Sequence, residues 1–210
     1  MHEDRHITLY HWPQSRAAGV RILLEELGAD YDVQVMNLQT GAQRQAGYLA
    51  INPMGKVPAI RHGDVLVTEQ AAIYMYLAEL YPEAGLSPAV GDPLRGPYLR
   101  WMVFYGSCFE PALIDRALKR DAPPRAMSPY GDADLVMKTI IDQLSGGPYM
   151  LGERFTAVDV LWAAALNWAA MFKLVPEEKV ISGYVDRILS RTACARAKTK
   201  DDALMASATA

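Results

Sequence analysis

Several features are scarce in this 210-residue sequence, and each absence excludes a class of protein. Only two cysteines are present, Cys108 and Cys194, which is too few for a disulfide framework and favours a reducing compartment, the cytoplasm. Basic residues are scattered and the net charge is −3, so nucleic acid is not an expected partner. No segment resembles a signal peptide. The longest apolar run, residues 157–172, is too short to span a bilayer and contains Asp159, so no membrane partner is expected either.

Motifs for nucleotide or metal chemistry are missing or misplaced. There is no G-x-G-x-x-G or Walker sequence, so no nucleotide cofactor is expected. The run His2-Glu3-Asp4-Arg5-His6 matches the zinc-protease pattern H-E-x-x-H, which needs a helix to place both imidazoles on one face. Here it lies at the extreme N-terminus, directly before a predicted strand, where residues are seldom ordered. We therefore expect a solvated tail and no metal site.

The first eighty residues follow a pattern typical of an α/β domain. A strand, a helix and a second strand within about thirty residues indicate a βαβ unit with parallel pairing. Apolar residues alternate in the expected strands and recur at helical spacing in the expected helices. The expected elements are strand 7–10, helix 17–27, strand 31–36, helix 43–51, strands 56–61 and 65–68, and helix 69–80.

The remaining chain predicts helices alone. Residues 82–92 are rich in proline and glycine and indicate a linker. Thr156 and Asp159 have the spacing of a capping box at the start of an apolar, central helix. The expected helices are 92–118 (bent near Pro111), 130–144, 157–172, 177–190 and 192–204. We therefore expect an α/β domain over residues 1–81, a linker over 82–92 and an all-helical domain over 93–210.

One serine stands where the first helix is expected to begin. Residues 9–27 predict a strand, a tight turn and a helix, and Ser15 lies at the turn. A hydroxyl there is beside free backbone N–H groups and the positive end of the helix dipole. It can therefore act as a helix cap or receive an anion, and the residues alone leave both open.

Four motifs resemble those of the cytosolic glutathione transferases, and the resemblance covers nearly the whole chain. The motifs are Tyr10 with Pro13-Gln14-Ser15-Arg16, Asn52-Pro53-Met54-Gly55-Lys56-Val57-Pro58, Thr68-Glu69-Gln70-Ala71-Ala72-Ile73, and Phe155-Thr156-Ala157-Val158-Asp159. The resemblance implies a thioredoxin-like N-terminal domain, an all-α C-terminal domain, glutathione as co-substrate and a homodimer.

The resemblance gives Ser15 a chemical role. A free thiol has a pKa of about 8.5, so a transferase must stabilise the thiolate of glutathione. The Pro13-x-Ser15 pattern resembles the serine-using, bacterial-type branches, which makes the Ser15 hydroxyl the expected donor to sulfur. Tyr10 is the alternative donor, because some branches use a tyrosine near the end of the first strand. No cysteine precedes Cys108, which argues against the branches that run disulfide exchange.

The same resemblance assigns the rest of the glutathione site. It implies a cis bond between Val57 and Pro58, with the Val57 backbone pairing with the glutathione peptide like an added strand. Glu69 and Gln70 are expected at the γ-glutamyl end, although Gln70 stands where the family usually has Ser. Two further residues, Lys56 and Gln43, match positions that the family uses near the glycine carboxylate.

The electrophile is expected beside the first long helix of the second domain. Trp12, Tyr105, Cys108 and Phe109 are the candidate pocket residues, with core packing as the alternative for an aromatic stripe. The sequence thus predicts a detoxifying glutathione S-transferase that attacks a small hydrophobic electrophile. The alternative is a non-catalytic glutathione-binding or scaffold protein on the same fold.

Overall fold

The computed structural model describes residues 5–121 and 123–208, which group into two compact units. The first unit holds the residues up to Leu86 together with those from Arg191 onward, and the second holds Ser87–Ser190. The C-terminal segment therefore groups with the α/β unit. The sequence had placed it in an all-helical domain over residues 93–210.

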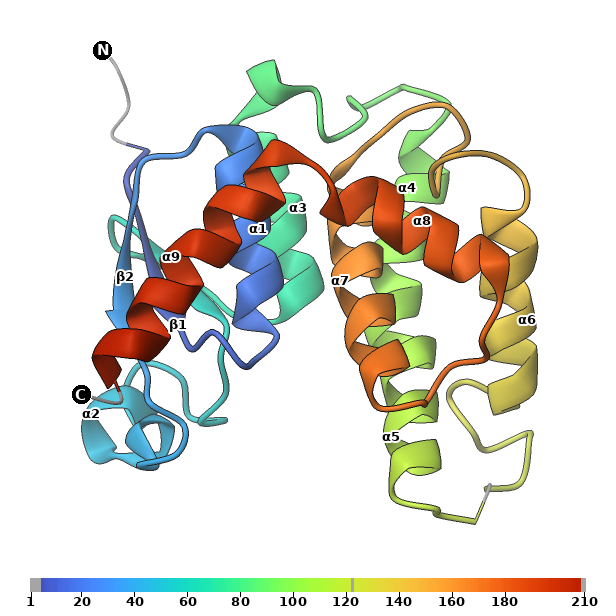
Figure 1. Cartoon of the computed structure of the whole chain (residues 1–210), viewed down its shortest axis with the longest axis horizontal. Coiled ribbons are helices and arrows are strands. Elements are labelled where there is room, and N and C mark those ends of the chain that lie inside the picture. Colours follow the sequence, from blue (N-terminus) through green and yellow to red (C-terminus); the bar gives the residue numbers. More distant parts are fainter. Residues whose placement is uncertain (1–4, 122, 209–210) are drawn as a thin grey trace. The chain divides into compact units, whose positions relative to one another are not determined.

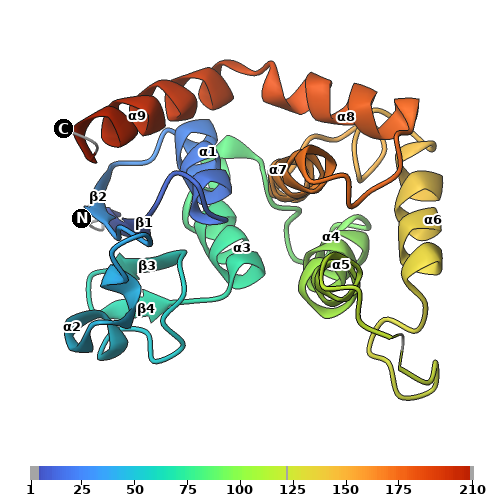
Figure 2. The same cartoon turned by 60° about the horizontal axis from the view of Figure 1, so that its bottom comes forward.

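A four-stranded mixed sheet forms the centre of the first unit (Figure 2). Its order is β2-β1-β3-β4, with β1 parallel to β2 and antiparallel to β3, which is in turn antiparallel to β4. The strands are β1 (Ile7–His11), β2 (Tyr31–Val35), β3 (Ala59–His62) and β4 (Val65–Val67). The strand expected over 56–61 begins late, at Ala59, because Pro58 has no N–H for the ladder.

Helices cover this sheet as the apolar spacing predicts. Helix α1 (Ala17–Leu27) lies beside α3 (Gln70–Leu80), and α1 ends at Gly28 in the left-handed conformation that glycine adopts freely (Figure 1). The weak helix expected over 43–51 is divided into a 3₁₀ turn, η1 (Ala42–Arg44), and the short α2 (Ala46–Leu49). A second 3₁₀ turn, η2 (Pro82–Ala84), follows α3.

The last helix belongs to the same unit. Helix α9 (Thr192–Ala208) packs along α1, and Figures 1 and 2 both show it running across that helix. Its buried residues are small, namely Ala193, Cys194 and Ala197. The helix therefore approaches α1 closely and buries little apolar surface, which leaves polar contacts to fix its position.

The second unit is helical, and its first long helix is interrupted. The single bent helix expected over 92–118 is divided into α4 (Arg95–Phe104), the π-helical turn η3 (Tyr105–Phe109) and α5 (Glu110–Ala117). Pro111 lacks the N–H of a regular helix, and the wide turn directly before it accommodates that loss. The later helices are α6 (Ala133–Leu144), α7 (Ala157–Met171) and α8 (Lys179–Leu189).

An apolar helix lies at the centre of this unit. Trp162 of α7 is fully buried, and its ring is 5.5 Å from that of Trp101 and 5.1 Å from that of Phe109 between centroids. The expected capping box at the start of α7 is present: the backbone N–H of Thr156 donates to Asp159 Oδ2 at 2.8 Å. The pattern of a helix that is apolar on nearly every side thus identified the core of the unit.

The zinc-protease pattern of the sequence lies mostly outside the described residues. Residues 2–4 lie outside the described residues. His6 is bound to two aspartates, with Nδ1 3.0 Å from Asp30 and Nε2 3.2 Å from Asp32. In the described part of the chain, no group of three or more His, Cys, Asp or Glu side chains is arranged to hold a metal ion.

No helix of the described ranges is both long and apolar enough to cross a membrane.

Candidate active site

The turn between β1 and α1 presents a half-buried serine hydroxyl. Ser15 Oγ donates to the carbonyl of Trp12 at 2.6 Å and accepts from the backbone N–H of Ala17 at 3.1 Å. The helix begins at Ala17, so Ser15 stands one residue before the N-cap position, which Arg16 occupies. The hydroxyl nevertheless satisfies one of the free N–H groups at the helix start. Its proton is held by a carbonyl that shares the same turn.

The alternative donor, Tyr10, lies in the core. Its ring is 5.5 Å from the ring of Tyr48, and the two pack with Met36 and Ala59. Side chains alternate along β1, so Tyr10 points to the face of the sheet opposite to that of His11, which meets α9. Tyr10 is only 7% exposed, so it is buried in the core of the first unit.

The starts of α1 and α3 are tied together at this turn. The side-chain amide of Gln70, the first residue of α3, donates to the carbonyl of Arg16 at 3.2 Å. Two helix N-termini, each carrying a partial positive charge, therefore meet beside Ser15. Gln70 was expected at the γ-glutamyl carboxylate, and its amide nitrogen here holds the scaffold of the site.

Glu69 has a strained backbone. Its φ is 64°, a left-handed value that residues other than glycine seldom adopt, and its side chain is exposed. Its carbonyl accepts the first hydrogen bond of α3, from the N–H of Ile73 at 2.9 Å. Such strain, typically about 1–3 kcal/mol, persists where the surroundings enforce it and is common at ligand sites.

The loop before β3 is held by side-chain hydrogen bonds to its backbone. The Val57–Pro58 bond is cis, as the resemblance implies. Next to it, the carbonyl of Lys56 accepts from the Tyr48 hydroxyl at 2.6 Å and from the Asn52 amide at 3.0 Å. Burial raises the pKa of Tyr48 to about 12, so its hydroxyl stays protonated and remains a donor. The Lys56 side chain is exposed.

Gln43 is more enclosed than a surface residue would be. Its side chain is 8% exposed, and Oε1 has no hydrogen-bond partner among the described residues. The Gln43 carbonyl also lies close to Gly55, where an added Cβ would come within 3.0 Å of it. The 3₁₀ turn η1 and the loop before Lys56 are thus in close contact, which brings the two expected glycine-carboxylate residues into one region.

The candidate electrophile residues occupy two different units. Trp12 is buried in the first unit, one residue after β1. Tyr105 and Phe109 are buried in the second unit against Trp162, and the Tyr105 hydroxyl donates to Glu110 at 2.6 Å. The fourth residue, Cys108, is half-buried, with its Sγ 3.5 Å from the Ser107 hydroxyl. Within the helical unit, the aromatic pair lies in the core, as the packing alternative states.

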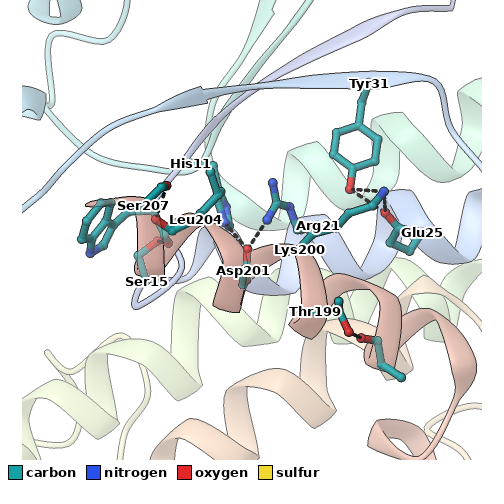
Figure 3. A network of polar contacts seen from close by, with 12 residues as sticks. His11, Ser15, Arg21, Glu25, Tyr31, Thr199, Lys200, Asp201, Leu204 and Ser207 are labelled. Carbon is teal, nitrogen blue, oxygen red and sulfur yellow. Dashed lines mark hydrogen bonds and ion pairs between the residues drawn. The ribbon is translucent and has the colours of Figure 1, made fainter. Parts of the chain in front are cut away.

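Three residues that the sequence did not single out form a polar cluster behind the turn. Asp201 of α9 lies between His11 of β1 and Arg21 of α1 (Figure 3). Its Oδ1 is 2.7 Å from His11 Nε2 and also pairs with the Arg21 guanidinium. His11 is fully buried and Arg21 is 4% exposed. The sequence offers one local signal for Arg21, which is a charged residue on the apolar face of the expected helix 17–27. Nothing in the sequence links Arg21 to Asp201.

Comparisons with known proteins agree with this geometry. Family models for the N-terminal and C-terminal domains of glutathione S-transferase match residues 5–79 and 132–192. Glutathione S-transferase 3 from Zea mays is 30% identical over 165 residues, 73% of each chain. Glutathione S-transferase GstA from Escherichia coli O157:H7 is 28% identical over 188 residues, 87% of this chain and 92% of that one.

A solved structure extends the likeness to the fold. A glutathione transferase homologue from Sulfitobacter, determined with bound glutathione, matches with a TM-score of 0.71 at 27% identity, covering 93% of this chain and 98% of that chain. The two family models match in the order expected of one architecture, and the maize relative is matched over nearly three quarters of its length. With its mixed four-stranded sheet, its cis proline before β3 and its helical second unit, the chain belongs to the glutathione S-transferase family.

Proposed function

We propose that this glutathione S-transferase binds glutathione at the end of β1 and the starts of α1 and α3, and that the Ser15 hydroxyl stabilises its thiolate. The thiolate then attacks a small hydrophobic electrophile. The observation that carries the proposal is the half-buried Ser15 hydroxyl beside two helix N-termini that Gln70 ties together. The proposal includes membership of the serine-using, bacterial-type branches of the family.

The energetics of the hydroxyl set the size of its effect. A hydrogen bond to a charged acceptor contributes about 1.5–3 kcal/mol, whereas a neutral one contributes about 0.5–1.5 kcal/mol. The Ser15 proton must turn from the Trp12 carbonyl to the sulfur, so the net gain is about 1–2 kcal/mol. That gain lowers the thiol pKa by about one unit from its free value of about 8.5. The helix N-termini add a smaller contribution of the same sign.

The backbone around the cis proline supplies the rest of the binding surface in this proposal. The Val57 main chain pairs with the glutathione peptide as an added strand. The hydrogen bonds that hold the Lys56 carbonyl fix this edge before the ligand arrives, so little conformational entropy is lost on binding. The exposed Lys56 ammonium and the Gln43 amide are placed at the glycine carboxylate.

The γ-glutamyl end is placed at the start of α3. The Glu69 carboxylate accepts hydrogen bonds from the γ-glutamyl amine. The free backbone N–H groups at the start of α3 donate to the γ-glutamyl carboxylate. The strained backbone of Glu69 supports this placement, because such strain is common at ligand sites and the residue is exposed. Gln70 keeps its bond to Arg16 and offers its own backbone N–H to the ligand.

The residues proposed to contact the electrophile are Trp12 in the first unit and Tyr105, Cys108 and Phe109 in the second. Within the helical unit Cys108 is half-buried, whereas the Tyr105 and Phe109 rings pack against each other in the core. The homodimer typical of the family and a cytoplasmic setting, where reduced thiols persist, complete the proposal. Sedimentation of the purified protein tests the oligomeric state directly.

The mechanism is tested by titrating the thiol of bound glutathione through the ultraviolet absorbance of its thiolate. We expect Ser15→Ala to raise the thiol pKa by about one unit and to lower turnover of an aromatic halide below neutral pH by about tenfold. Ser145→Ala is the matched control, because the Ser145 hydroxyl also donates to a backbone carbonyl, at 2.8 Å, but on α6. An unchanged thiol pKa in Ser15→Ala, with loss of activity in Tyr10→Phe, would overturn the assignment.

A further inference from the structure

Helix α9 is attached to the first unit mainly by charged side chains. Arg191, the residue before α9, pairs with Glu26 through two bonds of 2.6 and 2.9 Å, and Arg196 of α9 binds Glu25 at 2.9 Å. Lys200 also pairs with Glu25. The buried face of the helix is limited to alanines and a cysteine, so these ion pairs fix where the helix lies along α1.

Asp201 differs from these pairs because both of its partners are buried. Its own carboxylate is 14% exposed, whereas its partners His11 and Arg21 are 0% and 4% exposed. Figure 3 shows the carboxylate between the imidazole and the guanidinium. In the described part of the chain, His11 Nδ1 and Arg21 Nε have no hydrogen-bond partner. Asp201 is therefore the polar group that these two side chains share.

The partners of Asp201 flank the turn that carries Ser15. His11 is the last residue of β1, and Arg21 lies in the second turn of α1. The residue after His11 is Trp12, whose carbonyl accepts the Ser15 hydroxyl. One carboxylate thus connects the strand before the turn to the helix after it.

We propose that Asp201 is a positioning residue for the transferase reaction: it holds the end of β1 against α1 and so fixes the turn that presents Ser15. The backbone supplies a second anchor on the strand side, where the N–H of Met36 donates to the His11 carbonyl at 2.8 Å. Asp201 supplies the connection to the helix side. The C-terminal helix thereby contributes to the site through an ion pair, without Asp201 itself touching glutathione.

The geometry of the hydroxyl explains why such an anchor matters. A hydrogen bond weakens steeply when its donor and acceptor are displaced or misaligned. The Ser15 hydroxyl has one proton, which it donates either to the Trp12 carbonyl or to the sulfur of glutathione. A shift of the strand end relative to α1 changes both distances. Loss of Asp201 should therefore reduce thiolate stabilisation more than it reduces glutathione binding, which depends on the loop before β3 and the start of α3.

The test compares Asp201→Asn with Asp202→Asn, and it rests on the proposed role of Ser15. Asp202 is the matched control, because it is the adjacent residue and pairs along α9 itself, with Lys198 at 2.6 Å. Asp201→Asn leaves the buried Arg21 guanidinium without a counter-charge, so a double variant with Arg21→Gln removes both charges and preserves folding. Circular dichroism confirms that each variant is folded before the thiol of bound glutathione is titrated.

We expect the thiol pKa to rise by about one unit in both Asp201 variants, with kcat/KM about tenfold lower below neutral pH. Glutathione affinity and the rate well above the thiol pKa should change little, and Asp202→Asn should match the wild type. An unchanged thiol pKa in the folded double variant, or an equal change in Asp202→Asn, overturns the inference. Ser15→Ala is titrated alongside: if it leaves the thiol pKa unchanged, the proposed function fails, whereas a shift in Ser15→Ala alone rejects only the role of Asp201.

Discussion

Removal of the Asp159 carboxylate should destabilise the helical unit strongly. Its Oδ1 accepts from the N–H of Met150 at 2.7 Å and from the Tyr184 hydroxyl at 3.0 Å, and its Oδ2 accepts from the N–H of Thr156 at 2.8 Å. All of these groups are buried. In Asp159→Ala three buried donors lose their acceptor, at a cost of about 1–3 kcal/mol each.

An opposing effect reduces this loss at neutral pH. Burial raises the pKa of Asp159 from 3.8 to about 6, although its hydrogen bonds act in the other direction. A difference of about two units corresponds to about 3 kcal/mol, which the folded protein loses when the carboxyl ionises. We therefore expect Asp159→Ala to lower the free energy of unfolding by about 3 kcal/mol at about pH 7.

The pH dependence separates these two effects. A raised folded pKa means that the contribution of Asp159 is complete below pH 3.8 and is lost as the pH rises through about 6. The difference in unfolding free energy between wild type and Asp159→Ala should therefore be larger at about pH 5 than at about pH 7. If that difference stays constant or grows with pH, the hydrogen bonds outweigh burial and the reasoning is refuted.

The assay is urea unfolding followed by tryptophan fluorescence. Three of the four tryptophans, Trp101, Trp162 and Trp168, lie in the helical unit, so the signal reports mainly on that unit. Asp142→Ala is the matched control. Asp142 forms an exposed ion pair with Lys138 at 2.5 Å on α6, and such pairs contribute less than about 1 kcal/mol.

Two further predictions concern α9 and two glycines. Burial raises the pKa of Glu25, but hydrogen bonds from Lys200, Tyr31 and Arg196 outweigh it and give a net lowered value, so its stabilising contribution is lost as the pH falls below about 4.5. Glu25→Gln should lower the thermal unfolding temperature near neutral pH, and the difference from wild type should close in acid; a gap that persists there contradicts the role of the carboxylate. Gly147→Ala should destabilise by about 1–3 kcal/mol, because its Cβ would lie 3.0 Å from the Gly152 backbone, whereas Gly183→Ala, in open space on α8, should stabilise by up to about 1 kcal/mol. Chemical denaturation of both variants checks this pair, and equal signs would refute it.

Much of the fold followed from local patterns in the sequence. The alternation of β1 and the helical spacing of α1 predicted elements within a residue or two of those observed, because the strand and helix periods decide which side chains face the core. The predicted element boundaries differ from the observed ones where a single proline interrupts the hydrophobic pattern. Pro58 delayed β3, and the turn before Pro111 divided the first long helix of the second unit.

The site was predictable only in part. The motif around Ser15 and the N-P-x-G-K-V-P stretch predicted which segments form the proposed glutathione site, because both need particular residues at fixed short spacings. Whether the Ser15 hydroxyl only caps the helix or can donate to a ligand depends on which group accepts its proton. The tertiary structure shows that this acceptor is the Trp12 carbonyl, and the sequence does not. The placement of Gln70 against Arg16 likewise joins residues 54 positions apart.

The sequence by itself determined the α/β first unit, the helical second unit and the turn at Ser15, since these depend on periodicity, turn residues and short motifs. Only the tertiary structure decided where α9 belongs. Its sequence predicts a helix and nothing more, because its buried face is small and its polar contacts with the first unit join residues that are 171 to 190 positions apart. The interaction that places Asp201 behind Ser15 arises from burial of His11 and Arg21, a property of the folded chain that no local pattern contains.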